Sequence, residues 1–394
     1  MGIGLPRHAE IWLPGYLRSL VRARRERRQR RGVVDILLAV ADHYEPLHGG
    51  ASAEAGLRRV ERWAREYPVL AEPFIDADGC HPRHTFFFPI EQYRPELVDP
   101  LAGLCRRGFG EVEVHLHHDR DTAENLRAGL NRFTATLHRR HGLLSADGDG
   151  RVRYGFVHGN WALDNALPGG RWCGVTRELA ALRDTGCYAD FTLPAAPSPA
   201  QTRTVNEIYF ADCGQAGPKA HDRGVRAAAG RQPGASELLV VQGPLAVSWN
   251  QARRGIVPKV ENGSLHAGHP PTMARFDDWL SCGISVAGRP EWLFVKLYTH
   301  GAPEANAAML LGADTAAFHR QLTARFGAGG RLRLHYVTAR EMANIVCAAE
   351  AGESGNPGRF RDYALPRPPA AAGRPAQAGE ASGQRPQAPS GERA

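Results

Sequence analysis

The stretch EVEVHLHHDRDT (residues 111–122) begins as a strand and ends in a group of side chains that can bind metal. Alternation at period two places Val112 and Val114 on one face. The opposite face carries Glu111, Glu113 and His115. The alternation stops at Leu116, and the next polar residues are His117, His118, Asp119 and Asp121. The pattern therefore predicts a strand that passes into a loop at a cluster of imidazole and carboxylate groups.

Length and charge limit the class of protein. The chain has 394 residues, of which 43% are hydrophobic, so it can bury the core of one large α/β domain or of two smaller ones. The formal net charge is +8, but residues 18–31 contribute +7 from eight arginines and one glutamate. The rest of the chain is close to neutral. We therefore expect no nucleic-acid-binding face on the folded body.

Cysteine usage and hydropathy bear on the compartment. The seven cysteines are far apart and form no Cys-x-x-Cys pair, which fits reduced, buried thiols better than a disulfide framework or a zinc ribbon. The first 30 residues lack the uninterrupted apolar core of a signal peptide, and no window approaches 18 apolar residues. We expect a cytoplasmic protein that does not span the membrane.

Apolar runs and helix-like stretches alternate along the chain. The predicted strands are 33–41, 84–88, 111–116, 152–157, 188–192, 238–247, 292–299 and 332–337. The clearest predicted helices are 52–66, 95–107, 122–141 and 174–185. This alternation predicts an α/β fold with a parallel sheet, either closed as a barrel or open. Residues 213–236, rich in Gly, Ala and Arg, are expected to form a surface loop or insertion.

The chain divides into three parts. Residues 1–32 form a basic amphipathic segment, and residues 33–365 hold the predicted strands as one domain. Residues 366–394 are dominated by Pro, Ala, Gly, Ser and charged residues with little to bury, which predicts a disordered tail.

Polar residues, most of them titratable, stand at the ends of five predicted strands. In order they are Asp42, His43 and Glu45; the 115–121 group; His158, Asn160, Trp161 and Asp164; Asp190; and Tyr298 with His300. In a parallel α/β barrel these strand ends converge on one face, where the loops build the active site. Each residue alone has a structural explanation, such as an Asx-type turn for Asp42 and His43 before Pro46, or a buried hydrogen bond for His300. The functional interpretation is favoured because all these explanations would have to hold together.

These strand-end residues resemble those of the polysaccharide deacetylase (NodB-like) superfamily of carbohydrate esterases, over roughly residues 33–365. The resemblance implies a distorted (β/α) barrel of seven or eight strands that holds one divalent metal ion, usually zinc. It implies Asp42 as the catalytic base, His300 as the acid and Asp190 as a residue that orients the base. The implied substrate is an acetylated carbohydrate or glycan precursor.

The resemblance also implies a set of metal ligands. These are drawn from His43, His115, His117, His118 and Asp119. His43 stands where the family has an Asp and Asp119 where it has a His, so a site of Asp42, His115 and His117 or His118 also fits. The residues that fall where the family contacts its substrate are His158, Asn160, Trp161 and Asp164.

Such a site suits hydrolysis of an amide or ester. A metal held by imidazoles and a carboxylate brings the pKa of a bound water to about 7 and polarises a carbonyl. Asp42 would take the proton of the water, and His300 would protonate the leaving group. Two other classes remain open. One is a glycosidase with its carboxylates among Asp42, Glu45, Asp164 and Asp190. The other is a non-catalytic carbohydrate-binding protein of the same fold.

The arginine-rich segment has two interpretations. It suits a solvated helix or arm. In WLPGYLRSLVRARRERR (residues 12–28), apolar residues also recur at helical spacing beside a dense arginine face. Such a helix could make peripheral contact with anionic lipid at the inner face of the membrane.

Deletion of residues 367–394 should change the melting temperature by no more than about two degrees, because the tail lacks apolar surface to offset the entropy of ordering. Thermal denaturation of the truncated and full-length chains tests this. A large fall in the melting temperature would show that the tail packs on the domain.

Overall fold

The computed structural model of the protein describes residues 6–253, 257–327 and 329–369. A sheet of 12 strands runs through it, with mostly parallel pairing. Its main path is β12 (Ser264–Leu265), β13 (Trp292–Thr299), β1 (Val34–His43), β2 (His84–Pro89), β3 (Gly110–Leu116), β5 (Val152–His158), β6 (Cys187–Asp190), β9 (Glu237–Val241), β7 (Ile208–Asp212) and β8 (Val225–Arg226). Two strands lie off this path. β14 (Leu332–Tyr336) pairs with β1, and β4 (Ser145–Ala146) pairs with β5.

The predicted elements are confirmed, with shifts of up to six residues in their bounds. The largest shift is in the predicted strand 238–247, which ends at Val241, while residues 246 and 247 begin another strand. All eight predicted strands occur, as β1, β2, β3, β5, β6, β9, β13 and β14. The four predicted helices occur as α2 (Ala53–Ala71), α3 (Pro95–Arg106), α4 (Ala123–His141) and α5 (Glu178–Asp184). Ser52 and Thr122 cap α2 and α4 by accepting backbone N–H groups of the first turn. Residues 213–236 contain β8, which pairs antiparallel with β7.

Other elements were not predicted individually. Helices α6 (Met273–Ser281), α7 (Glu304–Leu310), α8 (Ala313–Phe326) and α9 (Ala339–Glu350) lie in the C-terminal part. A hairpin of β10 (Ala246–Arg253) and β11 (Val257–Glu261) forms a separate two-stranded sheet.

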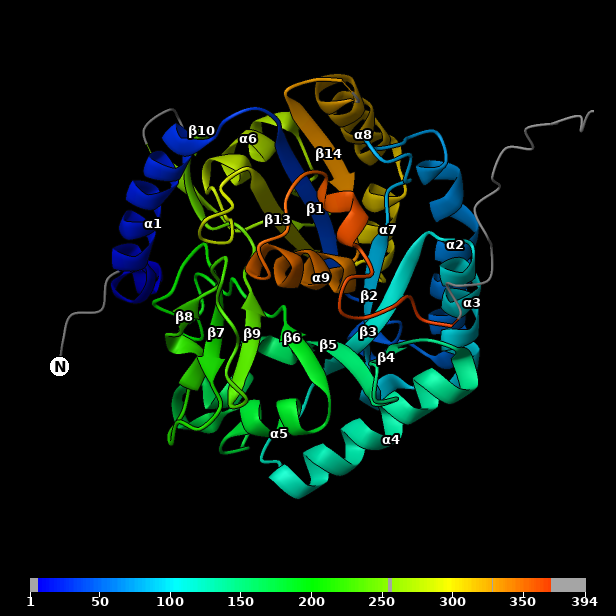
Figure 1. The fold of residues 1–394 in the computed structure, drawn as a ribbon. Coiled ribbons are helices and arrows are strands. Elements are labelled where there is room, and N and C mark those ends of the chain that lie inside the picture. The colour runs from blue at the N-terminus through cyan, green and yellow to red at the C-terminus, as the bar shows by residue number, and fades with distance from the viewer. Residues whose placement is uncertain (1–5, 254–256, 328, 370–394) are drawn as a thin grey trace, which may run out of the picture.

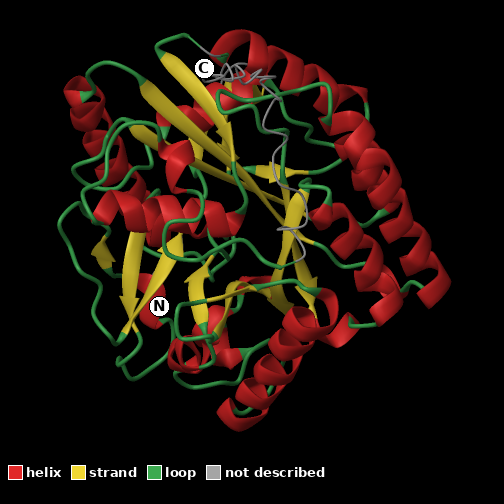
Figure 2. Cartoon of the chain, turned by 45° about the vertical axis from the view of Figure 1, so that its right-hand side comes forward, coloured by secondary structure: helices red, strands yellow, loops and turns green. Residues whose placement is uncertain are grey.

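The side chains of β1 alternate between two apolar cores. Ile36 and Leu38 pack with residues of α2, α3 and α4, whereas Leu37 and Ala39 pack with residues of α9. Figure 1 shows α9 lying across the strands, with α2, α3 and α4 along the outer edge. Helices flank the strands in the rotated view as well (Figure 2). The two faces of the sheet are therefore both buried, as a mostly parallel sheet requires.

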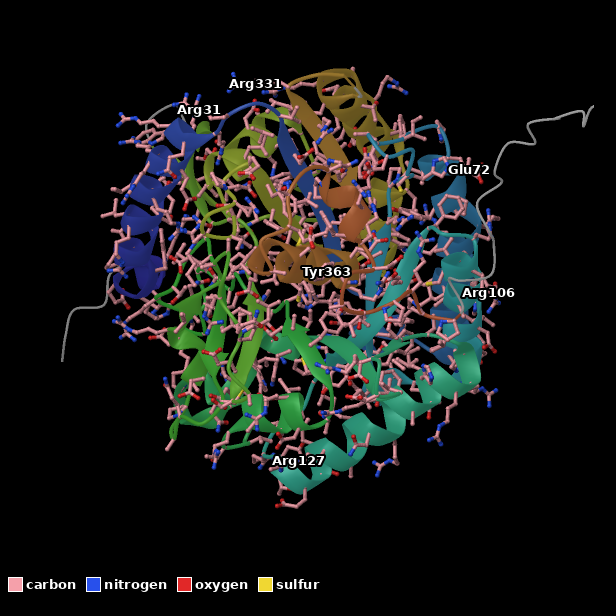
Figure 3. All side chains as sticks on the ribbon, viewed as in Figure 1. Arg31, Glu72, Arg106, Arg127, Arg331 and Tyr363 are labelled. Atoms are coloured by element: carbon pink, nitrogen blue, oxygen red, sulfur yellow. The ribbon has the colours of Figure 1, made fainter. Side chains whose placement is uncertain are left out.

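We call the face of the sheet that packs against α9 the inner face. Polar groups on this face are paired with one another in the core. Glu111 lies on the face opposite Val112 and Val114, as the alternation predicts, and this face points inward. Its carboxylate accepts hydrogen bonds from Arg340 of α9 and from Thr338. Side chains fill the space around α9, while those of Arg106 and Arg127 point outward from the rim (Figure 3). The paired charges thus allow a glutamate and an arginine to lie in a buried layer.

The strand pairings run in an open order, and no strand pair among the described residues joins β12 to β8. The sheet is nevertheless curled. Lys296 on β13 donates from Nζ to the carbonyls of Phe191 and Leu193, 2.6 and 2.5 Å away, just beyond the end of β6. These two strands are five places apart in the sheet order, so the inner face is concave.

The basic N-terminal segment forms α1 (Ala9–Gln29), which is docked on the body. Trp12 and Tyr16 are buried against Val205 and Leu245. Leu17 and Val21 remain exposed beside the arginines. No helix in the described part of the chain is long and apolar enough to cross a membrane. Most of the predicted tail, residues 370–394, lies outside the described residues.

Glu113 on the inner face should make stability depend on pH. Burial raises its pKa from 4.5 to about 8, against the hydrogen bonds from Tyr188 Oη and Gly155 N. Between these values the folded state keeps a proton that the unfolded chain has lost, so the free energy of unfolding falls as pH rises through this window.

Glu113→Gln should therefore flatten this fall, by on the order of 3 kcal/mol between pH 5 and pH 8. Urea denaturation at the two pH values measures it. Glu61→Gln, which removes an exposed carboxylate from α2, is the control. Parallel pH dependences of Glu113→Gln and the wild type would contradict the prediction.

Candidate metal centre

The last two residues of β1, Asp42 and His43, point to opposite faces of the sheet. Because alternate residues of a strand point to opposite faces, Asp42 faces α2 with Ile36 and Leu38, while His43 faces inward with Leu37 and Ala39. Asp42 and His43 therefore do not share a site.

Asp42 is a buried anchor between three strands. Its Oδ2 lies 2.8 Å from His84 Nε2 on β2, and its Oδ1 accepts the backbone N–H of Gly301 at 2.7 Å. Trp63 of α2 donates to the carbonyl of the same glycine at 3.0 Å. A Cβ on Gly301 would lie 2.1 Å from Asp42 Oδ2, so this contact requires glycine. Asp42 thus fixes the backbone immediately after His300.

On the inner side, histidines surround Glu45. Its Oε1 lies 3.3 Å from His115 Nε2, 3.5 Å from His117 Nε2 and 3.8 Å from His300 Nε2. Its Oε2 lies 2.6 Å from Nδ1 of His48. We call this group, with His43, the histidine cluster: His43, Glu45, His48, His115, His117 and His300. It draws on the ends of β1, β3 and β13, the strand ends at which the sequence predicted a site.

Two of the imidazoles are oriented by their second nitrogen. His115 donates from Nδ1 to the carbonyl of Val157 at 2.8 Å, and His117 Nδ1 lies 2.7 Å from the carboxylate of Glu91. Both contacts place the proton on Nδ1 and leave the Nε2 lone pair facing Glu45. Imidazoles that bind metal are held in this way by carbonyl and carboxylate groups.

His43 completes the inner wall. Its ring centroid lies 5.0 Å from that of His115 and 4.7 Å from that of His300. Ligand atoms of His43, Glu45 and His115 all lie within 4.8 Å of one another. The rings of Trp161 and Tyr298 are 6.4 and 6.1 Å from His43, so aromatic faces border the cluster.

The cluster is buried at its base and open at its rim. His43, Glu45 and His115 are buried, whereas the side chains of His117, His300 and His48 are 31, 32 and 48% exposed. Burial would raise the pKa of Glu45, but the nearby imidazoles of His115, His300 and His48 lower it to about 2. Burial, together with His300 and His115, holds the pKa of His43 well below 6.5. Glu91 and Glu45 raise the pKa of His117 against the effect of its burial. The base of the cluster thus offers a neutral imidazole at His43 and an ionised carboxylate at Glu45, which are the states that bind a cation.

Several predicted site residues lie elsewhere. Asp119 is partly exposed and accepts the backbone N–H of Trp172 at 2.6 Å. Asp190 is buried and bound by Thr192, and burial raises its pKa to about 6. Asp164 accepts backbone N–H groups of Glu178 and Ala220. Asn160 is half-buried with a left-handed φ of 54°.

His118 and His158 belong to a different group. They meet Cys173 and Glu178, and we call these four residues the cysteine cluster. The HLHHD stretch therefore divides between two clusters, with His115 and His117 in the first and His118 in the second.

Sequence reasoning missed part of both groups. Glu45 was considered only as a glycosidase carboxylate, although its spacing from His43 places both beyond the same strand. Glu91 and His48 had no recognisable signal. Cys173 was assigned with the other cysteines to reduced, buried thiols, and Glu178 was not among the candidates. Sequence spacing does not detect ligands that meet only in three dimensions.

A third group is structural. Asp76, Asp78 and His335 converge, but Arg361 Nη2 lies 3.1 and 3.0 Å from the two carboxylates. The guanidinium supplies the positive charge that a metal would otherwise bring. A cleft of about 900 Å³ lined by residues 165–170 and 218–220, among others, includes no member of the histidine cluster.

Comparison with known proteins identifies no relationship: no protein-family model and no curated protein sequence matches the chain. The function is therefore argued from the site itself.

Asp42→Ala should destabilise the protein by about 2–5 kcal/mol, because it leaves buried His84 and the Gly301 N–H without their acceptor. Urea denaturation measures the loss. Asp149→Ala removes an exposed carboxylate and should change stability by less than about 0.5 kcal/mol. Equal stability of Asp42→Ala and the control would show that Asp42 anchors nothing.

Proposed function

We propose that the histidine cluster holds one divalent metal ion, zinc by its ligand chemistry, and that the protein is a metal-dependent hydrolase that removes acetyl groups from a carbohydrate. The observation that carries this proposal is the convergence of imidazole Nε2 atoms on one buried carboxylate at the carboxyl ends of parallel strands. Mixed imidazole and carboxylate ligands with exposed neighbours are typical of catalytic zinc sites.

The ligands we assign are His43, Glu45 and His115, with His117 beside them. These donors fit a cation, since His115 and His117 already have a proton on Nδ1 and Glu45 is ionised. When bound, the metal would activate water and polarise the acyl carbonyl.

Proton transfer falls to residues on the open rim. His300 lies beside His43 with its side chain 32% exposed, where it can protonate a leaving amine or alkoxide. His48, paired with Glu45, is placed to exchange a proton with solvent. Asp42, which the resemblance implies as the base, acts in this proposal through the backbone of Gly301 and so positions His300.

The carbohydrate part of the proposal is supported by the border of the cluster. The indole N–H of Trp161 is buried and has no hydrogen-bond acceptor among the described residues. Next to His43, it can donate to a ligand hydroxyl while the ring lies against an apolar sugar face.

The deacetylase resemblance implies a distorted barrel, which we include in the proposal. Two contacts support closure of the curled sheet. Residues 284–287 bond on one side to β13, through Phe294 N to Ile284 O, and on the other to the segment after β8, through Ala287 N to Ala227 O. Lys296 spans the interior from β13 to the end of β6.

The contacts of the other carboxylates disfavour a glycosidase. Such an enzyme needs two carboxyl groups about 5–10 Å apart around the bond. Asp164 and Asp190 are bound by backbone or threonine groups, and Glu45 is enclosed by imidazoles. A non-catalytic carbohydrate-binding protein is the outcome if glycan binds and no acetate is released.

The test combines metal analysis with acetate release from N- and O-acetylated sugars. The wild type should bind metal in the cluster and release acetate. His115→Ala should lose the metal of this cluster and activity, because a central ligand is gone. His300→Ala should keep the metal and lose activity by at least about 100-fold, since a proton donor is needed only for turnover.

The control is His266→Ala, which removes an exposed histidine outside both clusters and should change neither readout. Undiminished metal content and acetate release in His115→Ala would overturn the proposal. A wild type that binds metal but releases no acetate from any of the sugars would refute the assigned reaction and leave the metal centre.

A further inference from the structure

The cysteine cluster brings together four potential ligands from four places in the fold. His118 follows β3, His158 ends β5, Cys173 lies in the loop between β5 and α5, and Glu178 is the first residue of α5. The side chains of His158, Cys173 and Glu178 are fully buried, and that of His118 is 7% exposed. None of these residues takes part in the proposed hydrolysis.

Their ligand atoms converge on one point. His118 Nε2 lies 2.8 Å from His158 Nε2, and Glu178 Oε1 lies 3.1 and 3.4 Å from these two nitrogens. Cys173 Sγ lies 3.3 Å from Glu178 Oε2. Ligands about 2.0–2.3 Å from a tetrahedral zinc are separated by about 3.3–3.6 Å. The ligand atoms of the four residues all lie within 4.8 Å of one another, so modest side-chain shifts would admit the ion.

The outward-facing atoms of the cluster already have partners. His118 Nδ1 lies 2.9 Å from Asp121 Oδ2, and His158 Nδ1 lies 2.6 Å from the carbonyl of Gly159. Both acceptors require a proton on Nδ1, so in the neutral imidazoles both Nε2 atoms carry lone pairs. Two nitrogen lone pairs and a carboxylate oxygen then face one another within 3.4 Å. Such an arrangement needs positive charge at its centre.

Glu178 and Cys173 are also oriented by hydrogen bonds from the backbone. Glu178 Oε2 accepts the backbone N–H of Asp164 at 2.6 Å, while its buried Oε1 accepts no hydrogen bond among the described residues. The backbone N–H of Val175 donates to Cys173 Sγ at 3.4 Å, which orients the sulfur. Each of the four residues thus directs one electron-rich atom inward.

We propose that His118, His158, Cys173 and Glu178 form a second metal site, a closed zinc site with a structural role. Two imidazoles, a thiolate and a carboxylate suit zinc, and full burial without an open position is typical of structural rather than catalytic sites. Binding displaces the thiol proton of Cys173 to solvent. The inference stands apart from the proposed hydrolysis.

The site would hold a segment that has little regular structure of its own. Residues 159–177 contain only short 3₁₀ turns and include six non-glycine residues with positive φ: Asn160, Trp161, Asp164, Asn165, Trp172 and Arg177. Trp161 of this segment borders the histidine cluster. A metal joining His158, Cys173 and Glu178 would therefore also set the position of that indole.

Cobalt substitution tests the inference in the full chain, expressed without a polyhistidine tag and stripped with EDTA. The histidine cluster contains no sulfur, so thiolate-to-cobalt charge-transfer absorption reports on the cysteine cluster alone. The band should appear at one equivalent of Co²⁺ in the wild type. It should be lost in Cys173→Ala and remain in Cys105→Ala, which removes another buried thiol.

Zinc-edge X-ray absorption of His115→Ala gives a second measurement that does not require Cys173→Ala to fold. It should show one sulfur at about 2.3 Å and lighter ligands at about 2.0–2.2 Å. A folded wild type without the cobalt band, a band that persists in Cys173→Ala, or zinc without a sulfur neighbour would overturn the inference. A cobalt band in protein that releases no acetate would support the second site and refute only the proposed reaction.

Discussion

The candidate centre depends on a buried carboxylate that does not belong to it. Asp42 ties β1 to β2 through His84 and to the end of β13 through Gly301. These contacts fix the backbone on either side of the cluster, because His43 follows Asp42 and His300 precedes Gly301. Without such an anchor, two inward-facing histidines from separate strands would depend on loop packing for their separation. A carboxylate that accepts two hydrogen bonds in a buried layer is a specific constraint, since an apolar residue of similar size would leave both donors unpaired.

In both clusters, a hydrogen bond at Nδ1 orients the imidazoles. His115 and His158 direct Nδ1 to backbone carbonyls, whereas His117 and His118 direct it to carboxylates. In each case the outer contact selects the tautomer and turns Nε2 inward. The difference lies in access. The first cluster has three partly exposed imidazoles at its rim, and the second is closed and includes a thiol. Because of this difference in access, we assign catalysis to the histidine cluster and a structural role to the cysteine cluster.

The strands could be predicted from local sequence patterns, whereas the full set of site residues could not, because some of them meet only through the tertiary fold. Apolar runs and caps such as Ser52 and Thr122 are local signals, so the eight predicted strands and four helices all occur, with bounds that differ by up to six residues from those expected. Parallel strand ends converge for geometric reasons, which correctly brings His43, His115 and His300 together. The prediction that Asp42 and His43 share a site did not apply the period-two alternation of β1 to them, which points the two side chains to opposite faces. Sequence reasoning also missed Cys173 and Glu178, because their partners are distant in sequence and come close only through the loop between β5 and α5.

One glycine sets the spacing between the two clusters. His117 and His118 are adjacent in sequence yet point to different clusters, and His117 packs on Gly159, the residue after His158. A Cβ at Gly159 would lie 2.2 Å from His117 Cδ2, so any larger residue would push this imidazole away from Glu45. The carbonyl of the same glycine accepts from His158 Nδ1. A shift of the loop at Gly159 would therefore disturb a ligand atom on each side. The loop after β3 and the loop after β5 thus act as one unit, in which the closed cluster restrains the segment that borders the open one.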